Sequence, residues 1–189
     1  MDIKDPMQTK KLREEMENSE GMEIKVTMTA EHLFTFSMYN SYNGWKLIFA
    51  VGFTLAWIVV LFATWNMEAS VWHQKLLMTF CILIFPVLQP YLLWTSTKKQ
   101  AKTIGFSTPV TLKLAHNHIY IEQAGHCGDF EWARIKRFIR IKAMFIMDMG
   151  YGRAYLIPNE SIRGREQELV DFVKKQLPET KTKGLKAFA

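Results

Sequence analysis

Two apolar segments without charged side chains constrain this chain more than any other feature. They are Leu47–Trp65 (LIFAVGFTLAWIVVLFATW) and Leu76–Trp94 (LLMTFCILIFPVLQPYLLW). At helical rise, about nineteen residues cover about 30 Å, the thickness of the hydrocarbon core of a bilayer. Buried helices of a soluble protein are one alternative, but such long uncharged helices are rare there. A cleavable signal peptide is another, but the first segment starts far from Met1. The sequence therefore predicts two transmembrane helices.

The flanking residues predict how these helices are oriented. Trp45 and Lys46 precede the first segment, and aromatic residues close both segments, as is typical at a membrane interface. Three lysines follow the second segment: Lys98, Lys99 and Lys102. Positive charge favours the cytoplasmic side, and Lys75 alone is a lysine on the opposite side. We expect a multi-pass protein of the cell membrane with both termini in the cytoplasm.

The second apolar segment contains two prolines. Pro86 and Pro90 each lack a backbone donor, so we expect a kink and freed carbonyl groups that find partners on the first helix. Gln89 lies between them and could form a hydrogen bond across the hairpin. The hairpin, with its flanks, is assigned to residues 45–97.

The residues before the hairpin divide into two parts. Residues 1–21 form a polar tail that we expect to be disordered or a frayed helix, and Met22 could equally be a start. In residues 22–44, alternating apolar residues predict a strand over Met22–Thr29. A helix rich in aromatic residues should open at Thr29, and its apolar surface favours an interfacial amphipathic helix.

After the hairpin, residues 103–178 carry the signals of a small antiparallel β-domain. The predicted strands are 110–116, 118–124, 129–135, 137–149 and 154–158, with turns at Gly125, Gly128, Gly150 and Gly152. Apolar residues at helical spacing then predict a closing helix over Arg163–Leu177, and 179–189 is expected to be a basic tail. The fold class is α+β: a transmembrane helical hairpin with a β-domain closed by a C-terminal helix.

This order of elements resembles the YcxB-like family of small bacterial membrane proteins over about 22–177. The residues that carry the resemblance are Phe34, Phe36, Tyr39, Glu131, Trp132, Ile135, Tyr155, Leu156, Ile157 and Pro158, together with the closing helix. The resemblance implies a pleckstrin-homology-like fold for the β-domain. It implies little about activity.

The charge of the chain points to anionic partners. The chain has 24 Lys and Arg against 18 Asp and Glu, a formal net charge of +6. Its two cysteines, Cys81 and Cys127, fall in a predicted span and in the β-domain, so a disulfide is not expected.

The most informative polar feature is a basic run, which comprises Arg134, Lys136, Arg137, Arg140 and Lys142. On an extended strand Lys136, Arg140 and Lys142 share one face with Phe138, and each charge near an anionic leaflet contributes about 1 kcal/mol of attraction. These residues could equally be solvated side chains that only set the topology. Nucleic acid is not expected as a partner, because Phe138 alone is too little aromatic surface.

No catalytic motif or cofactor-binding motif is present, which argues against an enzyme. The only candidates for metal ligands are His116, His118, His126 and Cys127, which could meet around one hairpin, or could simply rim a turn. Glu131 beside Trp132 could be a carboxyl group of raised pKa, but a core tryptophan is the preferred interpretation.

We therefore predict a membrane-anchored, non-enzymatic binding or regulatory module without cofactors. Its partners would be the lipid bilayer, with its anionic lipid, and a protein partner or a second copy of the chain. One alternative is an immunity or transport-associated protein that acts through the hairpin residues Pro86, Gln89 and Pro90. A metal-dependent enzyme that uses the histidine hairpin is the other.

Overall fold

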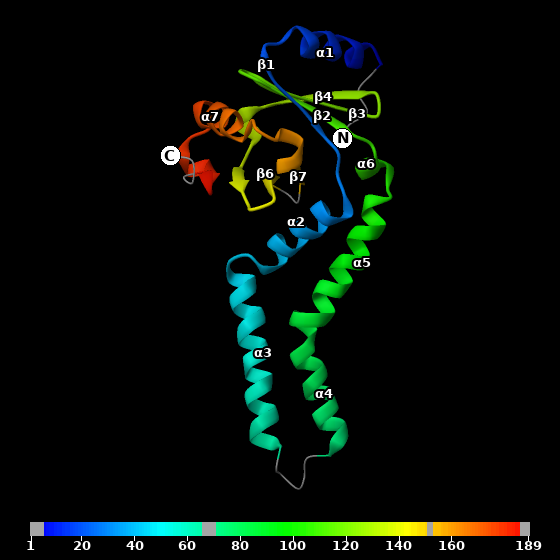
Figure 1. The fold of residues 1–189 in the computed structure, drawn as a ribbon, viewed down its shortest axis with the longest axis vertical. Helices are drawn as coiled ribbons and strands as arrows, with labels where there is room; N and C mark the ends of the chain where they lie inside the picture. Colours follow the sequence, from blue (N-terminus) through cyan, green and yellow to red (C-terminus); the bar gives the residue numbers. More distant parts are fainter. Residues whose placement is uncertain (1–5, 66–70, 151–152, 186–189) are drawn as a thin grey trace. The chain divides into compact units, whose positions relative to one another are not determined.

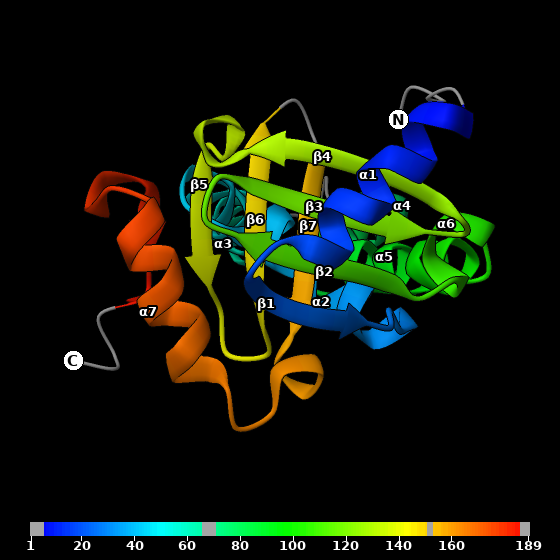
Figure 2. The ribbon, with the colours of Figure 1, turned by 90° about the horizontal axis from the view of Figure 1, so that it is seen from above.

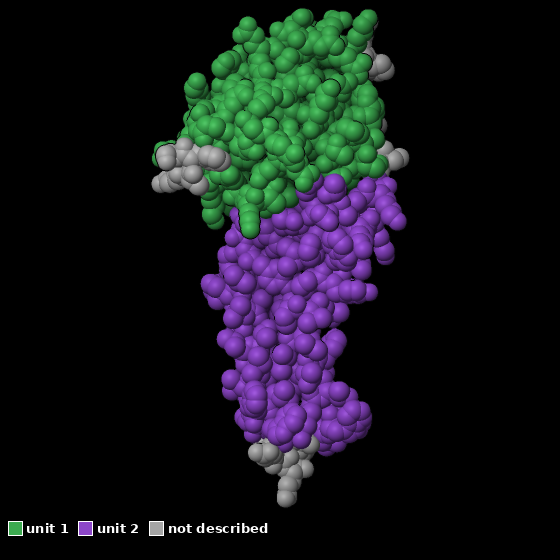
Figure 3. Space-filling view, viewed as in Figure 1, with its two compact units in different colours: residues 1–28, 104–189 green, residues 29–103 purple. Residues whose placement is uncertain are grey.

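The protein folds into two compact units. The computed structural model describes residues 6–65, 71–150 and 153–185. Residues 1–28 and 104–189 form one unit, the β-domain, and residues 29–103 form the other, the helical unit (Figure 3). The predicted segment 22–44 is therefore divided between them. Its strand belongs to the β-domain because it pairs with residues 110–115, far along the chain.

The helical unit holds the two apolar segments (Figure 1). Its elements are α2 (Ala30–Tyr42), α3 (Trp45–Thr64), α4 (Trp72–Leu83), the π-helix η1 (Ile84–Leu88) and α5 (Gln89–Ala101). The predicted start of α2 is confirmed, since Thr29 caps the helix and the Thr29 and His32 side chains each accept the other's backbone N–H at 3.3 Å. Gly44 then joins α2 to α3 with a φ of +63°, a conformation that favours glycine.

The second apolar segment is longer in the structure than the sequence predicts. From Trp72 to Ala101 the chain is helical over 30 residues, whereas the prediction covered Leu76–Trp94. The polar residues after Trp94 continue the helix and pack beside α2, where the rings of Phe34 and Trp94 meet edge to face at 5.1 Å. Helix α5 thus extends beyond the uncharged segment and carries Lys98 and Lys99 in its last turn.

The β-domain contains two four-stranded sheets, and its strands are β1 (Gly21–Val26), β2 (Val110–Ala115), β3 (His118–Gln123), β4 (His126–Glu131), β5 (Arg137–Arg140), β6 (Met144–Gly150), β7 (Arg153–Pro158) and β8 (Thr182–Lys183). One sheet has the order β1-β2-β3-β4 and the other β7-β6-β5-β8. All pairs are antiparallel except the parallel pair β5–β8. Seen from above, the strands of the first sheet cross those of the second (Figure 2).

A single core lies between the two sheets and is closed by helix α7 (Glu166–Gln176). Strand β1 shows how the sequence specifies this: Met22, Ile24 and Val26 are buried while the residues between them are exposed. From α7, Leu169 and Val173 enter the same core. The predicted antiparallel domain with a closing helix is confirmed.

Four short helices complete the domain, and they are α6 (Ile104–Ser107) and the 3-10 turns η2 (Trp132–Arg134), η3 (Asn159–Ile162) and η4 (Glu179–Lys181). The first of the 3-10 turns corrects the predicted strand 129–135, which ends at Glu131. There the chain leaves the first sheet and enters the second.

The predicted strand 137–149 is a hairpin, β5 and β6, rather than one strand. Ile141 and Met144 exchange backbone hydrogen bonds at 3.0 and 3.3 Å around the turn. Asn159 holds this turn from another part of the chain, because its backbone N–H donates to the carbonyl of Ala143 and its side chain to that of Lys142. The turn contains no glycine, proline or asparagine, so the sequence carries no local signal for it.

Of the four glycines predicted to mark turns, two lie at turns or strand ends, one lies within a strand, and one lies outside the described residues. Ala124 and Gly125 both have positive φ and form the tight turn between β3 and β4. Gly150 ends β6, also with positive φ. Gly128, however, lies within β4 opposite Ile121, so that prediction was wrong. Gly152 lies outside the described residues.

Both predicted tails contain regular structure. Residues Pro6–Asn18 form helix α1, which lies on the outer face of the first sheet. There Arg13 pairs with Glu122 at 2.5 Å, and the Lys113 ammonium group donates to the carbonyls of Met16 and Glu17. In the C-terminal tail, η4 is followed by β8, which extends the second sheet beside β5. A disordered N-terminal tail is therefore not what the structure shows for these residues.

Candidate functional site

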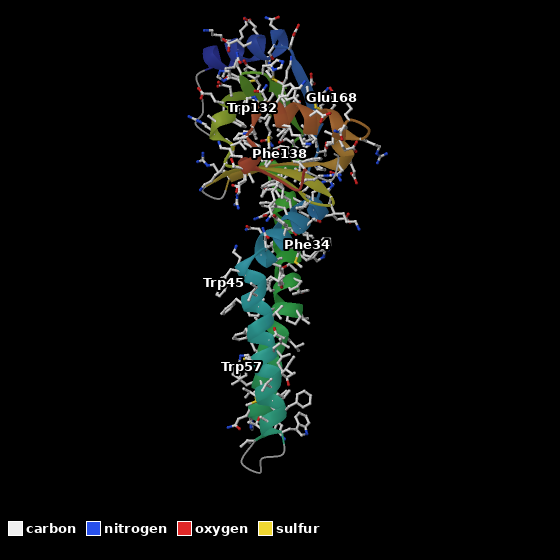
Figure 4. All side chains as sticks on the ribbon, turned by 90° about the vertical axis from the view of Figure 1, so that its left-hand side faces the viewer. Phe34, Trp45, Trp57, Trp132, Phe138 and Glu168 are labelled. Carbon is white, nitrogen blue, oxygen red and sulfur yellow. The ribbon has the colours of Figure 1, made fainter. Side chains whose placement is uncertain are left out.

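Few residues of the two long apolar helices are buried among the described residues. In the most apolar 18-residue window of α3 only 6% of the residues are buried, and none is buried in that of Trp72–Ala101. Trp45, Phe62 and Leu77 are among the side chains that are more than half exposed, and the sticks of Figure 4 project outward along the whole helix pair. Both helices are long and apolar enough to cross a membrane. Within the described part of the chain they are not buried as core helices.

Aromatic and basic side chains lie at both ends of the helix pair. At one end Trp65 and Trp72 are exposed, and the Lys75 ammonium group lies 4.9 Å from the Trp65 ring and donates to its backbone carbonyl. At the other end Lys98 lies 4.6 Å from the Trp94 ring. This pairing of rings with ammonium groups is typical of side chains at a membrane interface.

The predicted kink takes the form of a π-helical turn. Within η1 the backbone N–H of Gln89 donates to the carbonyl of Ile84, five residues back. The next such bond would join residue 90 to the carbonyl of Phe85, but Pro90 has no N–H. The carbonyl of Phe85 instead accepts the hydroxyl of Tyr42.

The prediction that a freed carbonyl finds a hydrogen-bond donor is confirmed for Phe85. The donor belongs to α2, however, and not to the first long helix as predicted. Sequence reasoning missed Tyr42. The available signal was general: a carbonyl freed by proline needs a donor, and tyrosine is a donor that tolerates apolar surroundings.

Gln89 does not form the expected bond across the hairpin through its carbonyl oxygen. The Gln89 Oε1 atom is buried, and no described residue donates a hydrogen bond to it. Close by, the Phe85 ring packs edge to face against Phe53 at 5.3 Å and against Phe49 at 6.0 Å. An unpaired amide oxygen therefore lies in largely apolar surroundings.

Two hollows flank this contact, and both include Ala50 and Phe85 in their lining. The larger, of about 390 Å³, is apolar and reaches from Met38 of α2 to Leu55 of α3. The smaller, of about 280 Å³, has polar lining residues, among them Lys46 and Gln89. The predicted hairpin residues Pro86 and Pro90 border the larger hollow.

The basic run lies around β5, but its members differ in environment. Arg134, Lys136 and Lys142 are exposed, and Arg140 is half-buried with its guanidinium group 5.5 Å from the ring of Phe145. Phe138 does not share their face, because it is completely buried in the core. The predicted surface strip, in which Phe138 lies among the basic side chains, is therefore not formed.

Arg137, the remaining member, is engaged by an acid. Its Nε and Nη2 donate to Asp148 Oδ2 at 3.1 and 2.8 Å, and the backbone N–H of Gly150 donates to Oδ1 at 2.8 Å. Burial raises the pKa of Asp148, but the Gly150 and Arg137 contacts outweigh it and hold the pKa below its ordinary value. Arg137 is thus largely neutralised locally.

The four candidate metal ligands lie at the two ends of the β3–β4 hairpin. His118 begins β3 and pairs with Glu131, whereas His126 pairs with Gln123 at the other end, about 17 Å away at strand rise. No group of three or more His, Cys, Asp or Glu residues among the described ones could hold a metal ion. Burial also raises the pKa of the Cys127 thiol, which disfavours the thiolate that a metal needs.

The histidines have other neighbours. His116 Nδ1 lies 3.0 Å from the side-chain nitrogen of Gln176 in α7, and His118 Nδ1 lies 3.4 Å from Asp129. Trp132 is a core residue, as predicted, and its indole N–H donates to the carbonyl of Ala115 at 2.8 Å. The neighbouring Glu131 is exposed.

Comparison of the chain with family models, with curated proteins and with solved structures gives no match in any of the three.

Proposed function

We propose that this chain is a two-span protein of the cell membrane that acts as a non-enzymatic binding module at the cytoplasmic face. One observation carries the proposal: α3 and α4–α5 present long stretches of apolar surface that the described residues leave exposed. In water, exposed apolar surface on this scale would drive association or aggregation. A bilayer is the solvent in which such helices are stable alone.

The energetics of α3 support insertion. The helix contains eleven Leu, Ile, Val or Phe residues, and each favours the bilayer centre by about 0.3–0.6 kcal/mol on an insertion scale, or about 3–7 kcal/mol together. Lys46 lies in its first turn, where the long side chain reaches the interface. From Trp45 to Trp65 the helix covers about 30 Å, which matches the hydrocarbon core.

The distribution of lysines supports an orientation with both termini in the cytoplasm. Lys46, Lys98 and Lys99 belong to the end of the helix pair from which the chain continues into the β-domain, while Lys75 lies at the opposite end. Lys75 is also engaged with Trp65. The larger number of lysines at the first end favours its placement inside.

The β5–β8 edge is the proposed contact surface for an anionic partner, either anionic lipid or an acidic protein. Strand β8 pairs with β5 and so brings Lys181 and Lys183 beside the exposed members of the basic run. Lys181 is anchored there by donating to the carbonyl of Ala133 at 3.2 Å. These two lysines add positive charge to a surface where Asp148 pairs with the charge of Arg137.

We further propose that the β-domain is pleckstrin-homology-like and that the chain is a YcxB-like protein. The supporting features are the order of elements, two crossing sheets around one core, and a C-terminal helix that closes that core. The proposal rests on this arrangement and on the residues quoted above.

Membrane fractionation and site-directed labelling test the proposal. The full chain should stay with membranes after alkaline carbonate washing. In a background without Cys81 and Cys127, a membrane-impermeant maleimide should label Val71→Cys on intact cells and Lys174→Cys only after permeabilisation. Both positions are exposed in the structure. A chain that is monodisperse in plain buffer without detergent would overturn the membrane anchor, and labelling of both cysteines from outside would overturn the orientation.

Hydrogen exchange tests the partner surface. In nanodiscs that contain anionic lipid, the amides of the β5–β6 turn should exchange more slowly than in zwitterionic nanodiscs, and Lys136→Glu with Lys142→Glu should remove the difference. Reversal of Lys174 and Lys175, exposed on α7, is the matched control. If lipid charge has no effect, the lipid partner is wrong, and capture of an acidic protein that depends on the same two lysines then decides for the protein partner.

The π-turn favours one second function, in which the hairpin itself works within an oligomer or beside a transport protein. Its specific support is the buried, unpaired Gln89 Oε1 atom. Replacement of Pro86, Gln89 and Pro90 by leucine should then abolish activity in cells. Retained activity would assign the function to the β-domain.

A further inference from the structure

The C-terminal tail, residues 179–185, closes the edge of β5. It contains two lysines, Lys181 and Lys183, against one acid, Glu179. Its strand β8 pairs in parallel with β5 over only two residue pairs. Two charges of the proposed contact surface therefore reach it only while this short strand is docked.

The tail contacts the chain near both ends of the basic run. Near its beginning, the Lys181 ammonium group donates to the carbonyl of Ala133, the residue before Arg134. Near the other end, Gly184 passes so close to β5 that a Cβ atom on this glycine would lie 2.7 Å from the Arg140 carbonyl oxygen. Gly184 also has a φ of +79°, which favours glycine. A side chain at position 184 would therefore force the tail and β5 apart.

One apolar side chain anchors the end of the tail. Leu185 is 2% exposed and belongs to the core between the two sheets. Two strand pairs and one buried side chain are few contacts against the entropy lost when the backbone from Lys181 to Leu185 is ordered. The tail should therefore open at a lower free energy than the central strands. It is the part of this edge that a partner can stabilise.

Charge makes the docking of the tail sensitive to anions. A docked tail brings the positive charges of Lys181 and Lys183 to the strand that carries Arg140, and like charges repel each other. An anionic surface offsets this repulsion and attracts the same lysines. A partner that binds only the docked tail shifts the equilibrium toward the docked state. Docking and binding should therefore favour each other.

We infer that anionic lipid holds β8 in its docked position, and that Gly184 is a positioning residue for this contact although it carries no charge. The inference rests on the proposed contact surface and selects lipid as its partner. The β-domain is joined at residues 28–29 and 103–104 to the helical unit, which the proposed function inserts in the bilayer. This double connection keeps the domain at a high local concentration of lipid. An exposed lysine such as Lys183 suits a charged plane.

Hydrogen exchange of the full chain in nanodiscs tests the inference. Each lysine near an anionic leaflet favours the bound state by about a factor of five, so a peptide that spans β8 should exchange about 25-fold more slowly with phosphatidylglycerol than with phosphatidylcholine alone. Lys183→Gln removes one exposed charge and should reduce the slowing to about five-fold. Gly184→Ala should undock the tail, so that β8 exchanges rapidly in both lipids. The slowing at the β5–β6 turn should then fall to that of Lys181→Gln with Lys183→Gln.

Gly164→Ala is the matched control. Gly164 has nearly the same φ, +81°, but a Cβ atom there would meet nothing within 4 Å among the described residues. Alanine therefore adds a similar backbone cost without displacing β8, and the response to lipid charge should equal that of the unaltered chain. In a chain that already lacks both tail lysines, Gly184→Ala should not change the slowing at the β5–β6 turn any further. A merely structural defect would add to the loss.

The outcomes separate this inference from the proposed function. A β5–β6 turn that responds to lipid charge while β8 does not, or a full response in Gly184→Ala, overturns the inference and leaves the contact surface intact. No response at either segment overturns the lipid partner and the inference together. If β8 slows with polyglutamate and not with lipid charge, the choice of lipid is overturned in favour of an acidic protein. If Gly184→Ala does not fold, as judged by circular dichroism, Lys183→Gln still decides, because it leaves the backbone pairing of β8 unchanged.

Discussion

The hydroxyl of Tyr42 should stabilise the helical unit because it replaces a backbone donor that proline removes. Gln89 uses its N–H on Ile84, and Pro90 has none, so the carbonyl of Phe85 depends on Tyr42. Hydrogen bonds between helices in membranes contribute about 0.6 kcal/mol on average and up to about 1.7 kcal/mol. An acceptor left without a partner in a protein interior costs about 1–3 kcal/mol. We expect Tyr42→Phe to lower the free energy of unfolding by about 1–2 kcal/mol.

A double-mutant cycle isolates the cause. Pro90→Ala restores an N–H that can donate to the Phe85 carbonyl, so Tyr42→Phe should cost little in that background. The difference between the two backgrounds is the coupling energy, and it should equal most of the single-variant effect.

Unfolding of the full chain by dodecyl sulfate in mixed micelles, followed by circular dichroism, measures these free energies. Tyr39→Phe is the matched control, since it removes a hydroxyl from the same helix for which the structure gives no hydrogen bond within the described residues. An equal cost of Tyr42→Phe with and without Pro90, or an equal cost at Tyr39, would refute the reasoning.

Three further predictions concern the β-domain. Asp148→Asn should lower stability by about 1–2 kcal/mol at pH 7. Because the folded-state pKa of Asp148 is depressed, its contribution is complete above about pH 4 and disappears as pH falls through the folded value, so unfolding curves of the two proteins should converge in acid. Trp132→Phe keeps a ring in the core but leaves the Ala115 carbonyl unpaired, and chemical unfolding should show a loss of about 1–3 kcal/mol; no loss would mean that water replaces the indole. Leu169→Ala creates a cavity where the side chain is fully buried and should cost about 2–5 kcal/mol in the same assay, whereas Lys174→Ala on the exposed side of α7 should cost little.

The sequence by itself determined the elements whose signal is local and repeated. Uncharged runs of helical length specify α3 and α4–α5, alternation specifies β1, and apolar residues at helical spacing specify α7, because each pattern reports one buried or lipid-compatible face. The effects of the capping residue Thr29, of Pro86 in η1 and of Pro90 in α5 could also be predicted, since these residues act on the residues beside them. The sequence also shows directly which basic side chains and which histidines could contribute to a site.

Only the tertiary structure decided which of these residues meet. The β5–β6 turn has no turn residue of its own and is held by Asn159, and β8 is recruited from an apparently polar tail by pairing with β5. Asp148 on the neighbouring strand forms an ion pair with Arg137 and so neutralises one charge of the basic run. His118 and His126 are separated by the length of β3. Hydrogen bonds and ion pairs of this kind join residues far apart in the chain, so no local pattern records them.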